Sequence, residues 1–419
     1  QNTGVRECGE VLVEIVRQAG MDAKLMETGG QPAVYAEKIV SPDLPTVLFY
    51  GHYDVQPPDP IEDWLSPPFE PTVRDGRIFA RGAADNKGQF LCHVLAVEAW
   101  NKTAGRLPVN VKMIFDGEEE SSSVNLESFV SNHREMLSAD VVYTSDGPMH
   151  ENGRPYVLLG VRGIQYVELK ARGARWDNHS GNKGGVVPNP AWTLIDLLRT
   201  MRDENGRVLI EGFYDDVEEP GEKIMELVGN LPFDREGIRA TTGYDDFNLD
   251  PETYFRRLLL EPTFNIAGFN SGYHGKGMKT IIPADATLKM DMRLVVNQDP
   301  DDIFRKFEAH VRKHAPGVEV KNLGAMAPSR TAADLPVVAE ITEAVRDAYG
   351  KEPIIQPTLG GSLPDSVWTK TMGLPSVMVP YANADESNHS PNENLVVERF
   401  FDGIRCTLSV LDRLGAMKS

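Results

Sequence analysis

The chain lacks three things: a set of paired cysteines, a long apolar run and a surplus of basic side chains. Three cysteines among 419 residues cannot build a disulfide framework, and their scarcity favours a reducing, cytoplasmic location. No uninterrupted apolar stretch is long enough to span a bilayer, so we expect no membrane partner. A formal charge of -19 opposes binding to phosphate backbones, so we expect no nucleic-acid partner. Because the chain begins at Gln1 and not at a methionine, a targeting segment ahead of it stays an open alternative.

Two kinds of pattern divide the chain and predict two domains, since 419 residues exceed one compact core. Strand, loop and helix alternate as far as Asp146 and again after Ala333, which is typical of a doubly wound, mostly parallel α/β sheet. Half-exposed strands at 164–170 and 286–294 indicate a smaller α+β domain of ferredoxin-like type, and we expect the acidic stretch 203–250 to be a surface excursion. The expected division is 1–161 and 326–419 for the first domain, with 162–325 inserted in it.

Residue types that bind divalent metal follow four apolar runs. Short apolar runs bounded by turn residues predict buried strands of a parallel sheet, and here they are 47–50, 109–115, 141–143 and 377–379. Because the carboxyl ends of such strands meet at one edge of the sheet, the side chains beyond them should converge. These side chains are His52, one of the glutamates 118–120, Asp146 and His389, with Asp85 added from a glycine-flanked loop. Two imidazoles and three carboxylates suffice for two metal ions that share a bridging carboxylate.

Each of these features has an ordinary explanation when it is taken alone. His52 and Asp54 could be a structural pair in a turn, and the run 118–120 could be the solvated start of a helix. At the end of a buried strand, however, Asp54 can accept the second ring N–H of a ligating His52. One glutamate of the run can bind metal while its neighbour acts as general base. Their joint occurrence at strand ends favours a metal site.

Four sequence blocks that contain these residues resemble the signatures of the dinuclear zinc exopeptidase family. The blocks are 51–57, 81–88, 116–120 and 388–393, and they occur in the family's order. The family includes carnosinase, cytosolic nonspecific dipeptidase, glutamate carboxypeptidase, aminoacylase and succinyl-diaminopimelate desuccinylase. The His-Tyr-Asp-Val-Gln-Pro form at 52–57 is most similar to its dipeptidase branch.

The resemblance implies two divalent metal ions per subunit, with zinc expected and manganese or cobalt as alternatives. The implied ligands are His52, Asp85 and Asp146 for one ion and Asp85, Glu120 and His389 for the other. Asp54 would orient His52, and Glu119 would be the general base that activates a water shared by the two ions. A cis peptide bond between Asp85 and Asn86 is also implied.

The resemblance further implies that the inserted domain is the lid and dimerisation domain of a homodimer. His179, in the block 176–181, would reach the partner subunit's active site and polarise the scissile carbonyl. Thr280 and Arg293 would contact the substrate, with the arginine gripping its carboxylate through paired hydrogen bonds. Ser362 matches a loop that lines the substrate.

The chain departs from the family pattern at two places that bear on function. Ser122 stands where the family has glycine, so the turn after the metal ligand is expected to differ. Leu359 stands where dipeptidases have a glutamate that can pair with a free substrate amine. The expected function is therefore hydrolysis of dipeptides or short peptides with a free carboxylate, with an N-acyl amino acid amidohydrolase as the alternative. A catalytically silent metal-binding or scaffold protein is the alternative of another class, although a binder has no need of Glu119.

Overall fold

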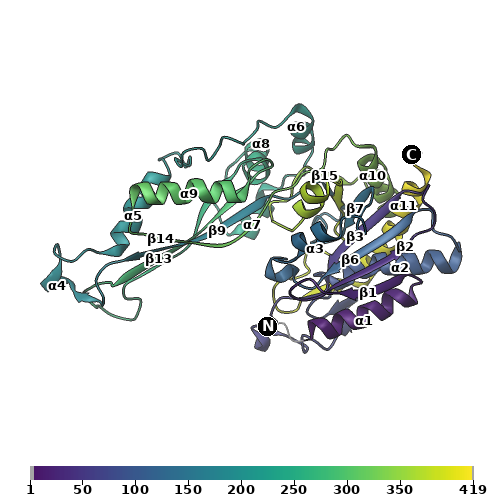
Figure 1. Ribbon diagram of the computed structural model, residues 1–419, viewed down its shortest axis with the longest axis horizontal. Coiled ribbons are helices and arrows are strands. Elements are labelled where there is room, and N and C mark those ends of the chain that lie inside the picture. Colours follow the sequence, from purple (N-terminus) through teal and green to yellow (C-terminus); the bar gives the residue numbers. More distant parts are fainter. Residues whose placement is uncertain (1–3, 418–419) are drawn as a thin grey trace.

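The computed structural model describes residues 4–417, which form two lobes that lie end to end (Figure 1). The larger lobe is built on an eight-stranded sheet with the order β1-β2-β6-β3-β7-β16-β8-β15. Its strands are β1 (Asp22–Met26), β2 (Ala33–Lys38), β3 (Thr46–His52), β6 (Asn110–Asp116), β7 (Val141–Thr144), β8 (Tyr156–Leu158), β15 (Ile354–Gln356) and β16 (Ser376–Met378). The central strands β6, β3, β7 and β16 are parallel, and antiparallel pairs occur at β1–β2, β2–β6 and β16–β8.

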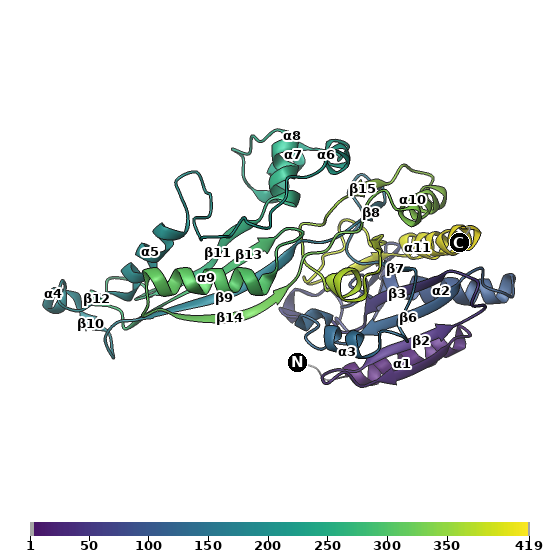
Figure 2. The same ribbon diagram turned by 45° about the horizontal axis from the view of Figure 1, so that its top comes forward.

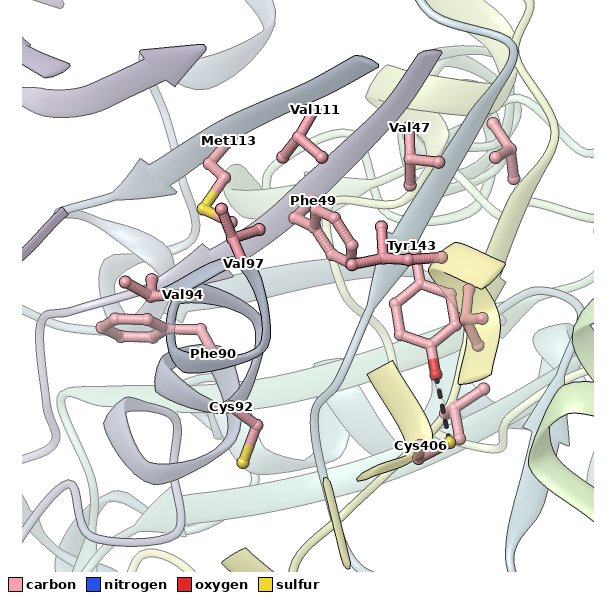
Figure 3. Packing of buried hydrophobic residues seen from close by; sticks show 14 of the residues in the cluster. Val47, Phe49, Phe90, Cys92, Val94, Val97, Val111, Met113, Tyr143 and Cys406 are labelled. Carbon is pink, nitrogen blue, oxygen red and sulfur yellow. Dashed lines mark hydrogen bonds between the residues drawn. The ribbon is translucent and has the colours of Figure 1, made fainter. Parts of the chain in front are cut away.

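Helices cover both faces of this sheet. The flanking elements are α1 (Val5–Gln18), α2 (Lys87–Thr103), α10 (Pro336–Tyr349) and α11 (Val397–Ala416) on one face, and α3 (Leu126–Asn132) with η4 (Val367–Met372) on the other. Val47 and Phe49 of β3 point to the first face and join the cluster that Figure 3 shows, whereas Leu48 and Tyr50 point to the second. Because alternate side chains enter two separate cores, the run 47–50 is apolar throughout. The predicted doubly wound α/β fold is confirmed.

The smaller lobe is an antiparallel sheet with the order β11-β13-β9-β14. Its elements in chain order are β9 (Gly163–Arg172), α5 (Pro190–Met201), β11 (Thr263–Ser271), β13 (Asp285–Leu294), α9 (Pro300–His314) and β14 (Glu319–Met326). This βαββαβ sequence is the ferredoxin-like arrangement. Alternate residues of β9 and β13 are buried under α5 and α9, while the opposite face stays open to solvent.

One strand of this lobe was not predicted, and one expectation is wrong. The edge strand β11 was missed, because its side chains are mostly exposed and show no clean alternation. The stretch 203–250 is more than a surface excursion, since it contains α6 (Glu222–Gly229) and α7 (Arg235–Thr242). Leu227 and Val228 of α6 are buried, and Val228 packs in one cluster with Ile354 of the edge strand β15. An acidic composition concealed a helix that covers the edge of the larger sheet.

The remaining elements complete the two lobes. They are β4 (Thr72–Arg74), β5 (Arg77–Phe79) and β17 (Asn394–Val396) beside the large sheet, α8 (Pro251–Phe255) with η3 (Arg256–Leu260) beside α6, and β10 (Asn178–His179), α4 (Ser180–Lys183) and β12 (Ile281–Ile282) at the far tip of the smaller lobe (Figure 2). Because β9 starts and β14 ends where the chain passes between the lobes, we propose domain boundaries near residues 162 and 325. Within residues 4–417, no helix combines the length and apolar character needed to cross a bilayer.

Candidate metal centre

The carboxyl ends of the central parallel strands bring polar side chains from distant parts of the sequence to one edge. β3 ends at His52, and β6, which runs beside it, ends at Asp116 just before the glutamates. β7 lies on the other side of β3 and is followed by Asp146. The strand order therefore produces the convergence that the sequence predicted, because parallel neighbours end on the same side.

The first of two potential ligand groups consists of His52, Asp85 and Asp146, all buried. Nε2 of His52 lies 3.0 Å from Oδ1 of Asp85 and 3.7 Å from Oδ2 of Asp146. One ligand atom from each residue lies within 4.8 Å of the others, which is close enough for all three to bind a single ion.

The second group consists of Asp85, Glu120 and His389. Nε2 of His389 lies 3.1 Å from Oδ2 of Asp85 and 3.3 Å from Oε2 of Glu120. Asp85 thus offers one oxygen to each group, which is the arrangement of a bridging carboxylate. The peptide bond between Asp85 and Asn86 is cis, as the family resemblance implied.

The charges around these groups fit two divalent cations. Burial, with Asp85 nearby, raises the pKa of Asp146 to about 7, and burial raises the pKa of Glu119 to about 8. The hydrogen bond with Asp85 raises the pKa of His389 to about 10. Raised carboxyl pKa values mean that ionising these buried, crowded groups costs free energy. A bound cation would offset this cost by stabilising the ionised carboxylates. Imidazole and carboxylate donors are also the ligands that zinc accepts.

Asp54 contacts both His52 and the backbone of Glu119 and Glu120. Its Oδ1 lies 3.3 Å from Nδ1 of His52, the ring nitrogen that faces away from Asp85. Its two oxygens also accept the backbone N–H groups of Glu119, at 3.2 Å, and Glu120, at 3.0 Å. Those residues begin the short helix η2 (Glu119–Ser121), so one carboxylate contacts the histidine and holds the turn. The sequence indicated the first contact and gave no sign of the second.

Gln56 is a further supporting residue that the sequence analysis missed. Its backbone N–H donates to Oε1 of Glu120 at 3.2 Å, and its side-chain Nε2 donates to Oε2 at 2.8 Å. The carboxylate that faces His389 is thereby held at both oxygens. The only sequence signal for Gln56 was its place in the block 51–57, because no sequence pattern marks a glutamine that supports a metal ligand.

The turn after Glu120 has the left-handed backbone that glycine favours, although serines occupy it. Ser122 has a φ of 76° and Ser123 a φ of 46°, so two consecutive L residues adopt the left-handed region. Ser123 compensates by donating a hydrogen bond from its hydroxyl to Oδ2 of the buried Asp116 at 2.6 Å. The side chain of Ser122 is exposed.

We expect Ser122→Gly to raise the free energy of unfolding by about 0.5–1 kcal/mol, because glycine relieves the left-handed strain. Ser123→Gly should instead destabilise the protein, since it removes the hydrogen bond to Asp116. Urea unfolding of both variants at neutral pH measures the difference. A stabilising Ser123→Gly, or a destabilising Ser122→Gly, would contradict this reading of the turn.

The residues expected to contact the substrate lie in two separate places. Nη1 of Arg293, on β13, donates to Oγ of Ser362 at 2.8 Å, so these two are together near the junction of the lobes. His179 and Thr280 lie at the far tip of the smaller lobe, where β10 pairs with β12 and Ser180 N–H donates to the Thr280 carbonyl at 3.1 Å (Figure 2). The chain therefore does not bring His179 to its own metal-ligand groups in this conformation.

Comparison with known proteins agrees with this geometry. A model of peptidase family M20/M25/M40 matches residues 48–413. The human Beta-Ala-His dipeptidase is 30% identical over 388 residues, covering 89% of this chain and 76% of that protein. The Cys-Gly metallodipeptidase of Schizosaccharomyces pombe is 30% identical over 402 residues, covering 92% and 83%. An M20 family metallo-carboxypeptidase from Sulfolobus solfataricus has a TM-score of 0.93 at 37% identity, covering 99% of this chain and 95% of its own.

Proposed function

We propose that this chain, which belongs to peptidase family M20/M25/M40 and is a metal-dependent peptidase, hydrolyses dipeptides and short peptides that carry a free carboxylate. The observation that carries the proposal is the pair of ligand groups that share Asp85, with Glu119 beside them. Assay of the zinc-loaded protein against a panel of dipeptides, their C-terminal amides and N-acetylated forms tests it. Failure to cleave any of them would overturn the proposal.

Zinc is the proposed metal, and manganese or cobalt would suit the same histidine and carboxylate donors. Two such ions would polarise the scissile carbonyl and lower the pKa of the attacking water. We assign the residues of the first group and of the second group as the ligands, on the support of their mutual distances. Asp54 orients His52 in this scheme.

Glu119 acts as the general base in the proposed mechanism. It neighbours Glu120 on η2 but belongs to neither ligand group, so its carboxylate is left free for the water. Glu119 takes a proton from the attacking water and then passes it to the leaving amine. Bound cations would lower its raised pKa and keep it ionised at neutral pH.

Arg293 is the proposed partner of the substrate carboxylate, and Ser362 lies beside it. Thr280, at the tip of the inserted domain, is the other proposed substrate contact. A planar guanidinium matches a carboxylate through two parallel hydrogen bonds. Its present contact with Ser362 holds it over the loop 360–362.

Arg293→Met should lower kcat/KM for substrates with a free carboxylate by about tenfold to a hundredfold, the worth of hydrogen bonds to a charged group. The C-terminal amide of the same peptide should be cleaved slowly by both proteins, because it lacks the charge that Arg293 recognises. Steady-state kinetics on the two substrates check the expectation. An equal loss on both would mean that Arg293 acts on the fold and not on the carboxylate.

The second candidate function, cleavage of N-acylated amino acids or of longer peptides, is favoured by a hollow beside the first ligand group. A cavity of about 510 Å³ is lined by Asp146 and Leu359 together with apolar and polar side chains, among them the carboxylates of Glu151 and Asp385. Leu359 stands in this lining at the position where a dipeptidase would offer a carboxylate to a free amine. A substrate whose amine is blocked brings no positive charge that would need a partner at position 359.

Leu359→Glu should therefore raise kcat/KM for free dipeptides about tenfold relative to their N-acetylated forms, the worth of one charge-assisted hydrogen bond. Leu359→Gln, of similar size but neutral, is the control. The ratio of the two rates in each protein gives the result. An unchanged ratio would show that position 359 does not face the amine.

A homodimer is the proposed assembly, because the smaller lobe presents an unpaired sheet edge. β11 is the last strand of its sheet, and Ile266 and Phe269 on it are 50% and 40% exposed. Trp192, on the neighbouring helix α5, is 62% exposed. An exposed apolar edge strand is suited to pairing with a second copy of itself.

The homodimer would also complete the active site with the partner subunit's His179. Nδ1 of His179 accepts the N–H of Gly181 at 3.1 Å, so the proton of the neutral ring resides on Nε2. That nitrogen is a donor, as stabilisation of an oxyanion requires.

We also propose a cytoplasmic location. Cys8, Cys92 and Cys406 are all free thiols, and the last two are buried. Free thiols without a disulfide suit a reducing compartment.

A further inference from the structure

Glu393 is a buried glutamate to which the proposed mechanism assigns no role. It lies four residues beyond His389, in the loop that carries this ligand, and its side chain is fully buried. A buried carboxylate is costly unless it is paired and hydrogen-bonded, so its partners indicate what it does.

All of its observed partners belong to the segment 81–85, which ends at the shared ligand Asp85. Oε2 accepts Nη1 of Arg81 at 2.8 Å and the N–H of Gly82 at 2.9 Å. Oε1 accepts the N–H groups of Ala84 at 2.9 Å and of Asp85 itself at 3.0 Å. Both oxygens are thus occupied, and the guanidinium neutralises the charge.

The two segments are also joined by their backbones next to this contact. β17 pairs with β5, and the N–H of Ala80 donates to the carbonyl of Glu393 at 3.2 Å. The carboxylate therefore sits at the end of the pairing of β5 with β17, between the loop of Asp85 and the loop of His389. More than three hundred residues of sequence separate these two ligands.

We infer that Glu393, with Arg81, is a positioning residue for the second metal site, formed by Asp85, Glu120 and His389. It acts through the amide of Asp85 and through the loop of His389, and it touches neither metal nor substrate. The inference rests on the two-metal function proposed above.

We call the hydrogen bonds between Glu393 and the segment 81–85 the clasp. The second metal site depends on this clasp more than the first site does. Two of its three ligands, Asp85 and His389, stand on the loops that Glu393 joins. In the first site only Asp85 does, because His52 is on β3 and Asp146 follows β7 directly. Loss of the clasp should therefore weaken the second ion by about tenfold to a hundredfold, the usual effect of removing a group that orients a ligand.

The experiment is a zinc titration of the metal-free full chain in competition with a chelating dye. Glu393→Gln keeps the size of the side chain but removes the charge and leaves one oxygen for accepting, so the amides are only partly satisfied. Glu393→Asp keeps the charge and withdraws the carboxylate, and it decides the question if Glu393→Gln does not fold. Glu352→Gln is the control, because it breaks a surface ion pair with Arg346 of 2.7 Å.

The wild-type titration tests the proposed function, since fewer than two zinc ions per chain would overturn that function and the inference together. With two ions in the wild type, a Glu393 variant that binds the weaker ion at least about tenfold less tightly supports the clasp. A variant with unchanged affinities, or with both ions weakened equally, overturns it.

Glu120→Ala supplies a second readout, because it removes a ligand of the second site alone. In that background, Glu393→Gln should change the affinity of the remaining ion much less than it changes the second ion of the full site. An equally large loss there would show that Glu393 supports the whole fold and not the second site.

Discussion

Glu119→Gln is expected to lower turnover by at least about a hundredfold, the usual effect of losing a general base, while the metal content stays unchanged. Glutamine keeps the size and polarity of the side chain but cannot take a proton from the water. Glu119 lies outside both ligand groups, so its replacement removes no donor from either ion. Elemental analysis of the purified variant and single-turnover kinetics measure the two effects.

Glu120→Ala is the matched control on the neighbouring residue. Glu120 belongs to the second ligand group, and Oε2 lies 3.3 Å from the ligand nitrogen of His389. Its loss should reduce the metal content and, with it, the activity. If Glu119→Gln lost metal and Glu120→Ala kept it, the roles assigned to the two glutamates would be reversed.

The convergence of the potential metal ligands could be anticipated because strand ends are encoded locally. An apolar run that stops near His52, or just before Asp146, predicts a strand and its end from a few consecutive residues. Parallel neighbours then bring these ends together without any further information. The same reasoning gave the doubly wound sheet, which the structure has.

The supporting contacts could not be anticipated, because they depend on pairings that no local pattern records. Asp54 accepts backbone groups 65 and 66 residues away, and Glu393 accepts groups more than three hundred residues away. A backbone N–H has no sequence signature, so its partner is visible only in the fold. The edge strand β11 escaped for a related reason, since a strand exposed on most positions lacks the period that burial imposes.

In this conformation the tip of the smaller lobe, with β10, lies far from the strand ends that carry the potential ligands (Figure 2). Arg293 reaches the loop of Ser362 across the junction, while His179 lies on β10 at the opposite end of its lobe (Figure 2). Catalysis by a metal site of this kind benefits from exclusion of water when the domains close. If His179 meets the oxyanion, as proposed, it has to arrive from another chain while the lobes keep this conformation.

His179→Ala should depress kcat by about a hundredfold to a thousandfold, the range for loss of one oxyanion donor, and change KM much less. Metal content and dimerisation should stay as in the wild type, because His179 is exposed and belongs to neither ligand group. His179→Gln, which retains a donor, should recover part of the rate. A loss confined to KM would mean that His179 binds the substrate and does not act on the transition state.

Mixed dimers give the sharper form of this prediction. A dimer of one His179→Ala chain and one Glu119→Gln chain has one site with both defects and one with neither, if His179 serves the partner's site. Activity should therefore reappear when the two inactive proteins are dissociated, mixed and reassembled, and it should approach one intact site per mixed dimer. Differently tagged chains, purified in two steps, establish that mixed dimers have formed. If such dimers remain as inactive as their parents, His179 acts within its own chain, and the smaller lobe must then fold far enough to bring its tip to its own metal ligands.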